Sequence, residues 1–331
     1  DPIQHIDDDG GEIALCILSA INVGKLRNLG EMEELCDLAV RGLEELIDYQ
    51  DYPVAAAKRS TMARRSLGIG FIGLAHYLAK NGYSYSDQAA HDLIHTLTES
   101  FQYNLLKSSN QIAQEKGSCD AFSHTKYYDG ILPIDTYKKE VDEITTKEYN
   151  CDWDSLRNDI KTHGLRHSTL SAQMPSESSS IVSNATNGIE PPRAYLSIKK
   201  SKKGPLKQIV PGYPHLKTKY TLLWDMPSNE GYIKVVAVMQ KFFDQGISGN
   251  WSYNPENYED NEVPMDVMML DLLTTYKYGW KTSYYHNTYD AKKDIEDPIV
   301  PQGVVVPMNS PALDDLLNSL ELEEDCDSCK V

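Results

Sequence analysis

Two kinds of hydrophobic pattern occur along this chain, and together they predict a mixture of strands and helices. Residues 12–23 form a nearly unbroken apolar run, which is typical of a strand buried on both faces. Residues 31–50 repeat apolar side chains at helical spacing, from Leu35 to Leu46. Strands that alternate with helices along one chain indicate an α/β protein.

Further elements follow from the same patterns and from turn residues. Ser86 is expected to cap a long helix that runs to Lys116, and Asp152 to cap a shorter one over 153–163. We also expect helices over 64–80, 214–225, 231–245 and 265–279, and strands over 165–174, 195–199, 207–210 and 280–287. The expected strands, about five or six, favour part of a larger sheet or barrel.

The regular pattern ends near residue 290. Four prolines punctuate the remainder, and residues 290–331 hold 11 acidic residues against three lysines. Eleven negative and three positive charges give residues 290–331 a net charge of −8, which is nearly half of the chain's −17. We therefore expect a globular domain over 1–289 and a flexible acidic arm over 290–331.

Charge and hydropathy exclude two kinds of partner. A net charge of −17 argues against a broad basic face for nucleic acid. No apolar run approaches the roughly 20 residues that span a bilayer. The sequence begins at Asp1 without a signal-peptide pattern, so we expect a cytoplasmic protein with reduced thiols. A first residue other than Met leads us to expect a fragment, a processed product or a numbering that omits the start.

The first candidate site is the C-x-x-C pair Cys326 and Cys329 near the C-terminus. Such a pair can ligate zinc or exchange thiols with disulfides. Structural zinc needs four ligands, and the sequence has no second pair with suitable spacing. A mobile dithiol that carries electrons to another disulfide and a chance pair of free thiols both remain open.

A second candidate lies where the strand over 165–174 gives way to a helix. It consists of Pro175, Ser176, Glu177, Ser178 and Ser179. Backbone N–H groups and hydroxyls at a helix start can hold a phosphate. Taken alone, however, the segment also fits an ordinary serine-capped helix start.

Two further features need context. Tyr284 and Tyr285 are adjacent phenols that could pass a radical with its proton, but Tyr127-Tyr128 repeats the dipeptide. On a regular strand the two rings would point to opposite faces, so stacking them would need a local bend. Cys16 lies within the first apolar run, where a cysteine is usually a small core residue.

Together these features resemble the large subunit of class I ribonucleotide reductases. The matching stretches are Gly11–Cys16, Trp153–Leu156, Gly164–His167, Ser171-Ala172 with Pro175, Ser183–Pro192, Tyr284-Tyr285 with Asn287-Thr288, and Cys326–Cys329. The resemblance runs from about Glu12 to Val331. It implies an α/β fold: the C-terminal half of the family's ten-stranded α/β barrel, with a flexible C-terminal arm.

The resemblance also implies a reaction, the radical-based reduction of ribonucleoside diphosphates to deoxyribonucleoside diphosphates. Cys16 would be one of two thiols that reduce the substrate and become a disulfide. Tyr284 and Tyr285 would be the last radical relay, and residues 175–179 would hold the diphosphate.

Partners follow from the same resemblance. The family's Asn-x-Cys-x-Glu finger loop and the disulfide partner of Cys16 are absent from this sequence. We therefore expect activity only with the N-terminal portion of the large subunit, as in a naturally split, phage-type enzyme. A small (beta) subunit would hold the metal radical cofactor, and this chain would bind no cofactor or metal itself. Cys326 and Cys329 would re-reduce the disulfide and be reset by thioredoxin or glutaredoxin.

Two other classes of function remain open. One is a non-catalytic remnant or interaction subunit that binds phosphate or partners. The other is a standalone thiol oxidoreductase built on the C-x-x-C pair, which leaves most of the chain unexplained. Within the reductase superfamily, class II enzymes need no tyrosine relay and class III enzymes carry a glycyl radical near the C-terminus. Tyr284-Tyr285 and the terminal dithiol therefore favour class I.

Overall fold

The computed structural model describes residues 11–145, 147–201 and 204–289. Its α-helices are α1 (Glu31–Tyr49), α2 (Ala55–Arg64), α3 (Leu74–Asn81), α4 (Gln88–Lys116), α5 (Pro133–Thr136), α6 (Trp153–His163), α7 (Glu177–Val182), α8 (Tyr213–Leu216), α9 (Glu230–Gln240) and α10 (Met265–Tyr278). Its strands are β1 (Ile17–Asn22), β2 (Leu67–Ile72), β3 (Leu196–Ser201), β4 (Gly204–Ile209), β5 (Gly249–Tyr253) and β6 (Ser283–Thr288). The described chain is thus a mixed α/β structure.

The central sheet is parallel. β1 pairs with β2, and β5 pairs with β6, in parallel. Parallel bridges from Ile69 to Ser171 and from Gln173 to Ile247 insert residues 171–173 between β2 and the residues that lead into β5. The order across the sheet is therefore β1, β2, 171–173, β5 and β6. Within the described residues, β1 and β6 are its edges, and closure into a barrel is not seen.

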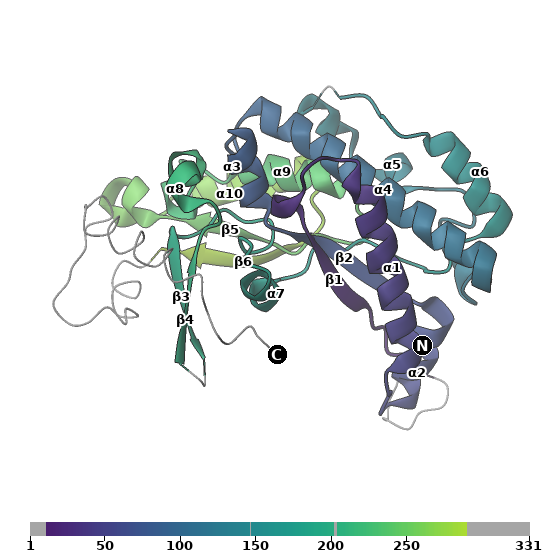
Figure 1. The fold of residues 1–331 in the computed structure, drawn as a ribbon. Coiled ribbons are helices and arrows are strands. Elements are labelled where there is room, and N and C mark those ends of the chain that lie inside the picture. The colour runs from purple at the N-terminus through teal and green to yellow at the C-terminus, as the bar shows by residue number, and fades with distance from the viewer. Residues whose placement is uncertain (1–10, 146, 202–203, 290–331) are drawn as a thin grey trace.

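The two faces of this sheet differ. Figure 1 shows α3, α4 and α9 above the strands, α1 beside β1 and β2, and α7 with the β3–β4 hairpin below them. On the helix side, the Phe71 ring of β2 lies 4.5 Å from the Phe101 ring of α4, centroid to centroid. Side chains alternate along a strand, so Gly68 and Gly70 face the other way. The second face is the one that carries Cys16.

The expected first strand is shorter and less buried than its apolar sequence predicts. β1 begins at Ile17, and Leu15 and Leu18 are exposed by 42% and 52%. Burial on both faces was therefore a wrong expectation for the described chain. The reason is that only one face of β1 meets the helices, whereas the face that carries Leu18 stays exposed in the described chain.

The expected helix over 64–80 is also wrong. The segment contains the strand β2, a left-handed turn at Gly73 with φ of +78°, and the helix α3. β2 is buried throughout and needs its glycines, because a Cβ added at Gly70 would lie 2.4 Å from the Ala172 carbonyl oxygen. Close strand contact, rather than helix packing, explains these glycines.

Other boundaries changed less. The single helix expected over 214–225 is α8 followed by the 3₁₀ turns Lys217–Lys219 and Leu223–Asp225. The long helix α4 begins after Asp87 rather than Ser86. The strands expected over 195–199 and 207–210 are confirmed as β3 and β4, which pair in antiparallel.

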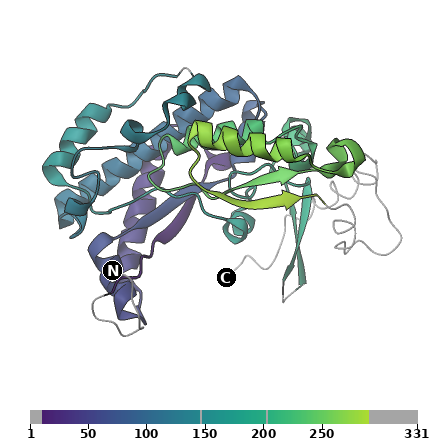
Figure 2. The same cartoon turned by 180° about the vertical axis from the view of Figure 1, so that it is seen from behind.

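From behind, Figure 2 shows α10 running along β5 and β6 on their helix-covered side.

Among the described helices, none combines the length and the apolar content needed to cross a bilayer. The expected arm over 290–331 lies outside the described residues, so the boundary at 289 remains a prediction.

Candidate active site

Cys16 lies at the entrance of β1, over a part of the sheet that has little side-chain volume. A Cβ added at Gly68 of β2 would lie 3.5 Å from the Cys16 Sγ and 3.3 Å from the Ala172 Cβ. The thiol therefore rests beside β2 and close to the 171–173 segment. Cys16 is exposed, yet nearby atoms desolvate its sulfur and raise the pKa of the thiol above its ordinary value.

A strand was expected over 165–174, but only Ser171 and Gln173 make isolated parallel bridges there, and the serine-rich segment follows these residues. Ser176 is buried, and its Oγ donates a hydrogen bond to the Met174 carbonyl at 3.0 Å, which closes the turn into α7. Glu177, Ser178 and Ser179 form the first turn of α7 and are exposed. The first turn of a helix presents backbone N–H groups to an incoming anion. The geometry thus places polar groups at the carboxyl end of a central strand.

The extended segment that leads to these serines is anchored by two polar side chains, the half-buried Asp244 and the buried Gln173. The Asp244 carboxylate accepts hydrogen bonds from the N–H of Leu170 at 2.8 Å, the N–H of Ser171 at 3.0 Å and the Tyr127 hydroxyl at 3.0 Å. The Gln173 side chain accepts from the Phe71 N–H at 2.8 Å and donates to the Phe71 carbonyl at 3.0 Å. Residues 171–173 make only isolated backbone bridges to their neighbours, and these two side chains satisfy further backbone groups there.

Tyr284 and Tyr285 lie at a β-bulge in β6. The pairing passes from Gly249 opposite Ser283 to Trp251 opposite His286, so both tyrosines oppose Asn250. The extra residue breaks the alternation, and the two ring centroids lie 4.2 Å apart with their planes at 57°. The sequence had predicted that ring contact would need such a local bend. Hydrogen bonding with Tyr285 raises the pKa of the exposed Tyr284 phenol.

A side-chain connection behind the bulge was missed by the sequence interpretation. The Asn250 Oδ1 accepts a hydrogen bond from the Tyr285 backbone N–H at 3.0 Å, and its Nδ2 donates to the Glu190 Oε1 at 2.5 Å. Burial raises the pKa of Glu190, although the bond from Asn250 acts in the opposite direction. β5 was not expected at all, and the alternating Trp251 and Tyr253 were the available signal for it.

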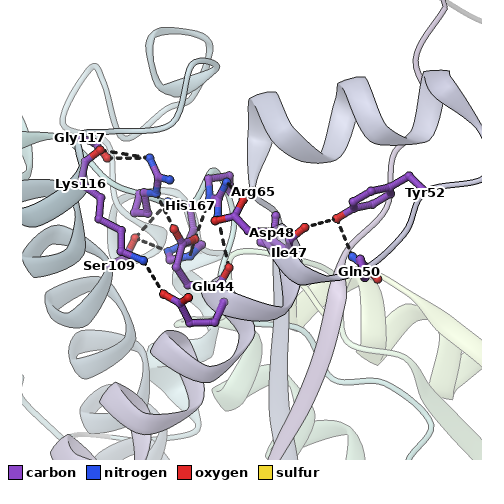
Figure 3. A network of polar contacts seen from close by, with 12 residues as sticks. Glu44, Ile47, Asp48, Gln50, Tyr52, Arg65, Ser109, Lys116, Gly117 and His167 are labelled. Atoms are coloured by element: carbon purple, nitrogen blue, oxygen red, sulfur yellow. Dashed lines mark hydrogen bonds and ion pairs between the residues drawn. The ribbon is translucent and has the colours of Figure 1, made fainter.

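The signature residues Arg166 and His167 both contact Glu44 of α1. Figure 3 shows Glu44 with His167, Arg65 and Ser109 in this network. Glu44 pairs with Arg65 at 2.7 Å, Arg166 at 2.7 Å and His167 at 3.1 Å. The other His167 ring nitrogen, Nδ1, hydrogen-bonds the Ser109 hydroxyl at 2.9 Å. The two signature residues therefore anchor the chain that leads into the 171–173 strand.

Three of the predicted features, which are Cys16, the serine-rich segment and the tyrosine pair, lie at different strands of one sheet. Cys16 lies at β1, the serine-rich segment follows the central strand, and the tyrosine pair lies on β6. Cys326 and Cys329 lie outside the described residues. In the part of the chain that the structure describes, no cluster of three or more His, Cys, Asp or Glu side chains is arranged to hold a metal ion.

A parallel α/β sheet with a cysteine, paired tyrosines and a polar loop is the arrangement that the resemblance led us to expect. The family model described as "Ribonucleotide reductase, barrel domain" matches residues 3–286. The chain belongs to this family, and it corresponds to the barrel domain in the C-terminal portion of the large subunit alpha.

Curated relatives agree with this assignment. The chain is 60% identical over 298 residues to the ribonucleoside-diphosphate reductase subunit alpha of Haemophilus influenzae, a match that covers 90% of this chain and 39% of that protein. Identity to subunit alpha of Escherichia coli reductase 1 is 57%, over 77% of this chain and 34% of that protein. Identity to subunit alpha of the Enterobacteria phage T4 reductase is 43%, over 87% of this chain and 38% of that protein. The chain thus spans little more than a third of the length of these relatives.

Proposed function

We propose that this chain is the substrate-reducing part of a class I ribonucleoside-diphosphate reductase, in which Cys16 is a redox thiol. The observation that carries the proposal is the placement of Cys16 over Gly68 of β2, the strand that lies between β1 and residues 171–173. Ala172, which precedes the serine-rich segment, lies on the other side of Gly68. A sulfur on this face can approach a substrate whose diphosphate is held at the carboxyl end of the central strand.

The chemistry assigned to Cys16 is a two-electron reduction at the ribose 2′ carbon. Two thiols lose two hydrogens and form a disulfide, while the 2′ hydroxyl leaves as water and the carbon gains hydrogen. Cys16 supplies one thiol, and the second comes from the remainder of the large subunit. Its raised pKa keeps Cys16 in the protonated thiol form at neutral pH, which is the form that donates hydrogen.

The diphosphate and the radical have separate supports in this proposal. The exposed first turn of α7, from Glu177 to Ser179, holds the diphosphate together with the turn at Pro175 and Ser176. The contacting rings of Tyr284 and Tyr285 pass the radical toward a cysteine supplied by the remainder of the large subunit. A small (beta) subunit supplies the radical from its own metal cofactor, and this chain holds none.

The sheet supports a role for a second half-barrel. Within the described residues, β1 and β6 are the edges of a parallel sheet, and Leu15 and Leu18 beside Cys16 are exposed. Parallel sheets are normally covered on both faces, and exposed strand edges invite pairing. We propose that the N-terminal portion of the large subunit completes the barrel here and brings the finger loop to Cys16.

The test is diphosphate reduction by the complete large subunit with its small subunit. Cys16→Ser is expected to abolish formation of deoxyribonucleoside diphosphate with any reductant, because one of the two reducing thiols is gone. Cys36→Ser is the matched control, because Cys36 is buried in α1 and lies away from the proposed site. Parental turnover by Cys16→Ser would overturn the proposal.

Arm function needs a separate experiment. Cys326→Ser and Cys329→Ser are expected to spare turnover driven by a small dithiol, which can reach the Cys16 disulfide directly. The same variants are expected to block turnover driven by thioredoxin or glutaredoxin, which we propose act through the arm. Arm variants that match the parent with thioredoxin would contradict this assignment.

A further inference from the structure

We propose, on the basis of the radical relay proposed above, that Asn250 is the positioning residue that holds the Tyr284–Tyr285 ring contact and that Glu190 orients it. Neither residue touches substrate in this proposal. The Asn250 side chain accepts a hydrogen bond from the Tyr285 backbone N–H, and Glu190 accepts one from the Asn250 amide.

The bulge creates the need for such a residue. Both tyrosines face a single residue of β5, so the extra residue falls out of the regular ladder of strand hydrogen bonds. The Tyr285 N–H finds its acceptor in the Asn250 side chain, at 3.0 Å. This bond fixes the backbone at the position where the two ring directions are decided.

Glu190 determines which end of the amide faces Tyr285. An asparagine amide can rotate by half a turn and exchange its oxygen for its NH₂ group. With the NH₂ group turned toward Tyr285, two donors would face each other. The Nδ2 of Asn250 instead donates to Glu190 Oε1 at 2.5 Å, which keeps the oxygen on the tyrosine side.

The neighbours on either side hold Asn250 in place. A Cβ added at Gly249 would lie 2.6 Å from the Trp280 ring and 2.9 Å from the Tyr232 hydroxyl, so the β5 backbone is pressed against the core. Beyond the bulge, the ring centroids of Trp251 and His286 lie 4.7 Å apart. The strand is thus fixed before and after the bulge, and the Asn250 side chain bonds within it.

Glu190 also ties the relay to the segment that follows the serine-rich loop. This segment runs from the end of α7 through Gly188, whose N–H donates to Ser180 Oγ at 3.3 Å, to Glu190. Radical transfer between phenols depends steeply on separation and orientation, and a displacement of about 1 Å at a reacting group can cost on the order of 100-fold in rate. Loss of the Asn250 bond to the Tyr285 N–H is therefore expected to slow the relay. The diphosphate loop keeps its own contact, from the Gly188 N–H to the Ser180 Oγ, and is expected to stay in place.

The experiment uses the complete large subunit with its small subunit and ribonucleoside diphosphate. Asn250→Leu removes both hydrogen bonds at similar volume, and is expected to lower kcat by roughly 10- to 100-fold while KM for the diphosphate stays unchanged. A radical trapped on an easily oxidised tyrosine analogue at position 284, measured by electron paramagnetic resonance, is expected to fall in parallel.

An exchange of donor and acceptor distinguishes positioning from general damage. Asn250→Asp alone places two carboxyl groups against each other and is expected to be slow. Glu190→Gln alone keeps an acceptor oxygen for Asn250 and is expected to stay close to the parent. The double variant Asn250→Asp with Glu190→Gln restores one donor and one acceptor between the two side chains, and is expected to recover at least half of the parental kcat.

Controls separate this proposal from the relay itself. Ser252→Ala, which removes a neighbouring cross-strand contact to Asn287, is expected to leave kcat unchanged. Tyr284→Phe and Tyr285→Phe are expected to abolish turnover; activity in either would overturn the relay function. If both are inactive, parental kcat in Asn250→Leu, or a double variant no faster than Asn250→Asp, would overturn the positioning role alone.

Discussion

At the scale of single residues, Glu44 shows why part of the family signature is structural. Its side chain is 1% exposed and faces Arg65, Arg166 and His167. A buried charge is costly unless it is paired, and removal of one partner leaves the others uncompensated. The sequence identified Arg166 and His167 as marks of the family but not their partner, because Glu44 lies 122 and 123 positions earlier in the chain.

Replacement of Glu44 should therefore destabilise the protein strongly. Glu44→Gln is expected to lower the free energy of unfolding by about 3 kcal/mol, because the neighbouring cations lose their counter-charge. Urea unfolding followed by tryptophan fluorescence measures the change. The adjacent Glu45 is the matched control, because it forms an exposed pair with Lys116, and Glu45→Gln is expected to cost less than about 1 kcal/mol. Equal effects of the two substitutions would contradict the network.

The pH dependence of this stabilisation has a definite sign. Burial alone would raise the pKa of Glu44, but hydrogen bonds from His167, Arg65 and Arg166 outweigh it and hold the pKa well below the usual 4.5. A carboxyl with a lowered folded pKa stabilises the fold above its unfolded pKa and loses that contribution as pH falls. The stability difference between the parent and Glu44→Gln should be constant from pH 7 to 5 and shrink below about 4.5. A difference that grows toward acid pH would show the opposite shift.

At the scale of elements, regular apolar spacing made the long helices predictable and close contacts made the strands difficult. α1 buries one stripe, and α4, which is buried on several sides, still repeats its apolar side chains at helical spacing. β2 was interpreted as part of a helix, because its glycines are required by contacts with residues far away in the sequence. β5 offered only a short alternation around Trp251. The need for a bend at the tyrosine pair was predictable, but the partner Asn250 was not, because strand register is a tertiary property.

Gly70 provides a direct test of the close contact between strands. Gly70→Ala would place a Cβ 2.4 Å from the Ala172 carbonyl oxygen. It is expected to lower the free energy of unfolding by about 1 to 3 kcal/mol, because the backbone must move to make room. Gly42→Ala in α1 is the control, because nothing lies within 4 Å of its added Cβ. That substitution is expected to stabilise the protein by up to about 1 kcal/mol. Thermal unfolding of both variants measures the contrast, and a neutral Gly70→Ala would refute the contact.

At the scale of the whole molecule, the described chain presents surfaces that suit a larger assembly. β1 is an edge strand with exposed Leu15 and Leu18, and α10 exposes the apolar side chains Met265, Met269, Leu270, Leu273 and Tyr276. Apolar surface of this extent marks an interaction site more often than a free surface. The family was predictable from sequence because its motifs keep their order, whereas the proposed assembly depends on contacts between polypeptides, which no motif of this sequence specifies.

Association can be measured with the N-terminal portion of the large subunit. The two polypeptides are expected to co-elute on size exclusion as one complex. Leu18→Lys, at the proposed seam, is expected to weaken the complex at least 10-fold, because it buries a charge there. Leu38→Lys, on the exposed side of α1, is expected to leave association unchanged. A chain that stays monomeric with its partner present would contradict completion of the barrel at β1.

The most direct test of the central claim follows the Cys16 thiol through a single turnover. The complete enzyme, carrying Cys326→Ser and Cys329→Ser so that electrons cannot leave through the arm, is mixed with ribonucleoside diphosphate and no external reductant. Cys16 is expected to react with an alkylating reagent before substrate is added and to be protected afterwards, in step with the deoxyribonucleotide formed, as mass spectrometry would show. If deoxyribonucleotide forms and Cys16 still reacts fully with the alkylating reagent afterwards, its role as the reducing thiol would be contradicted.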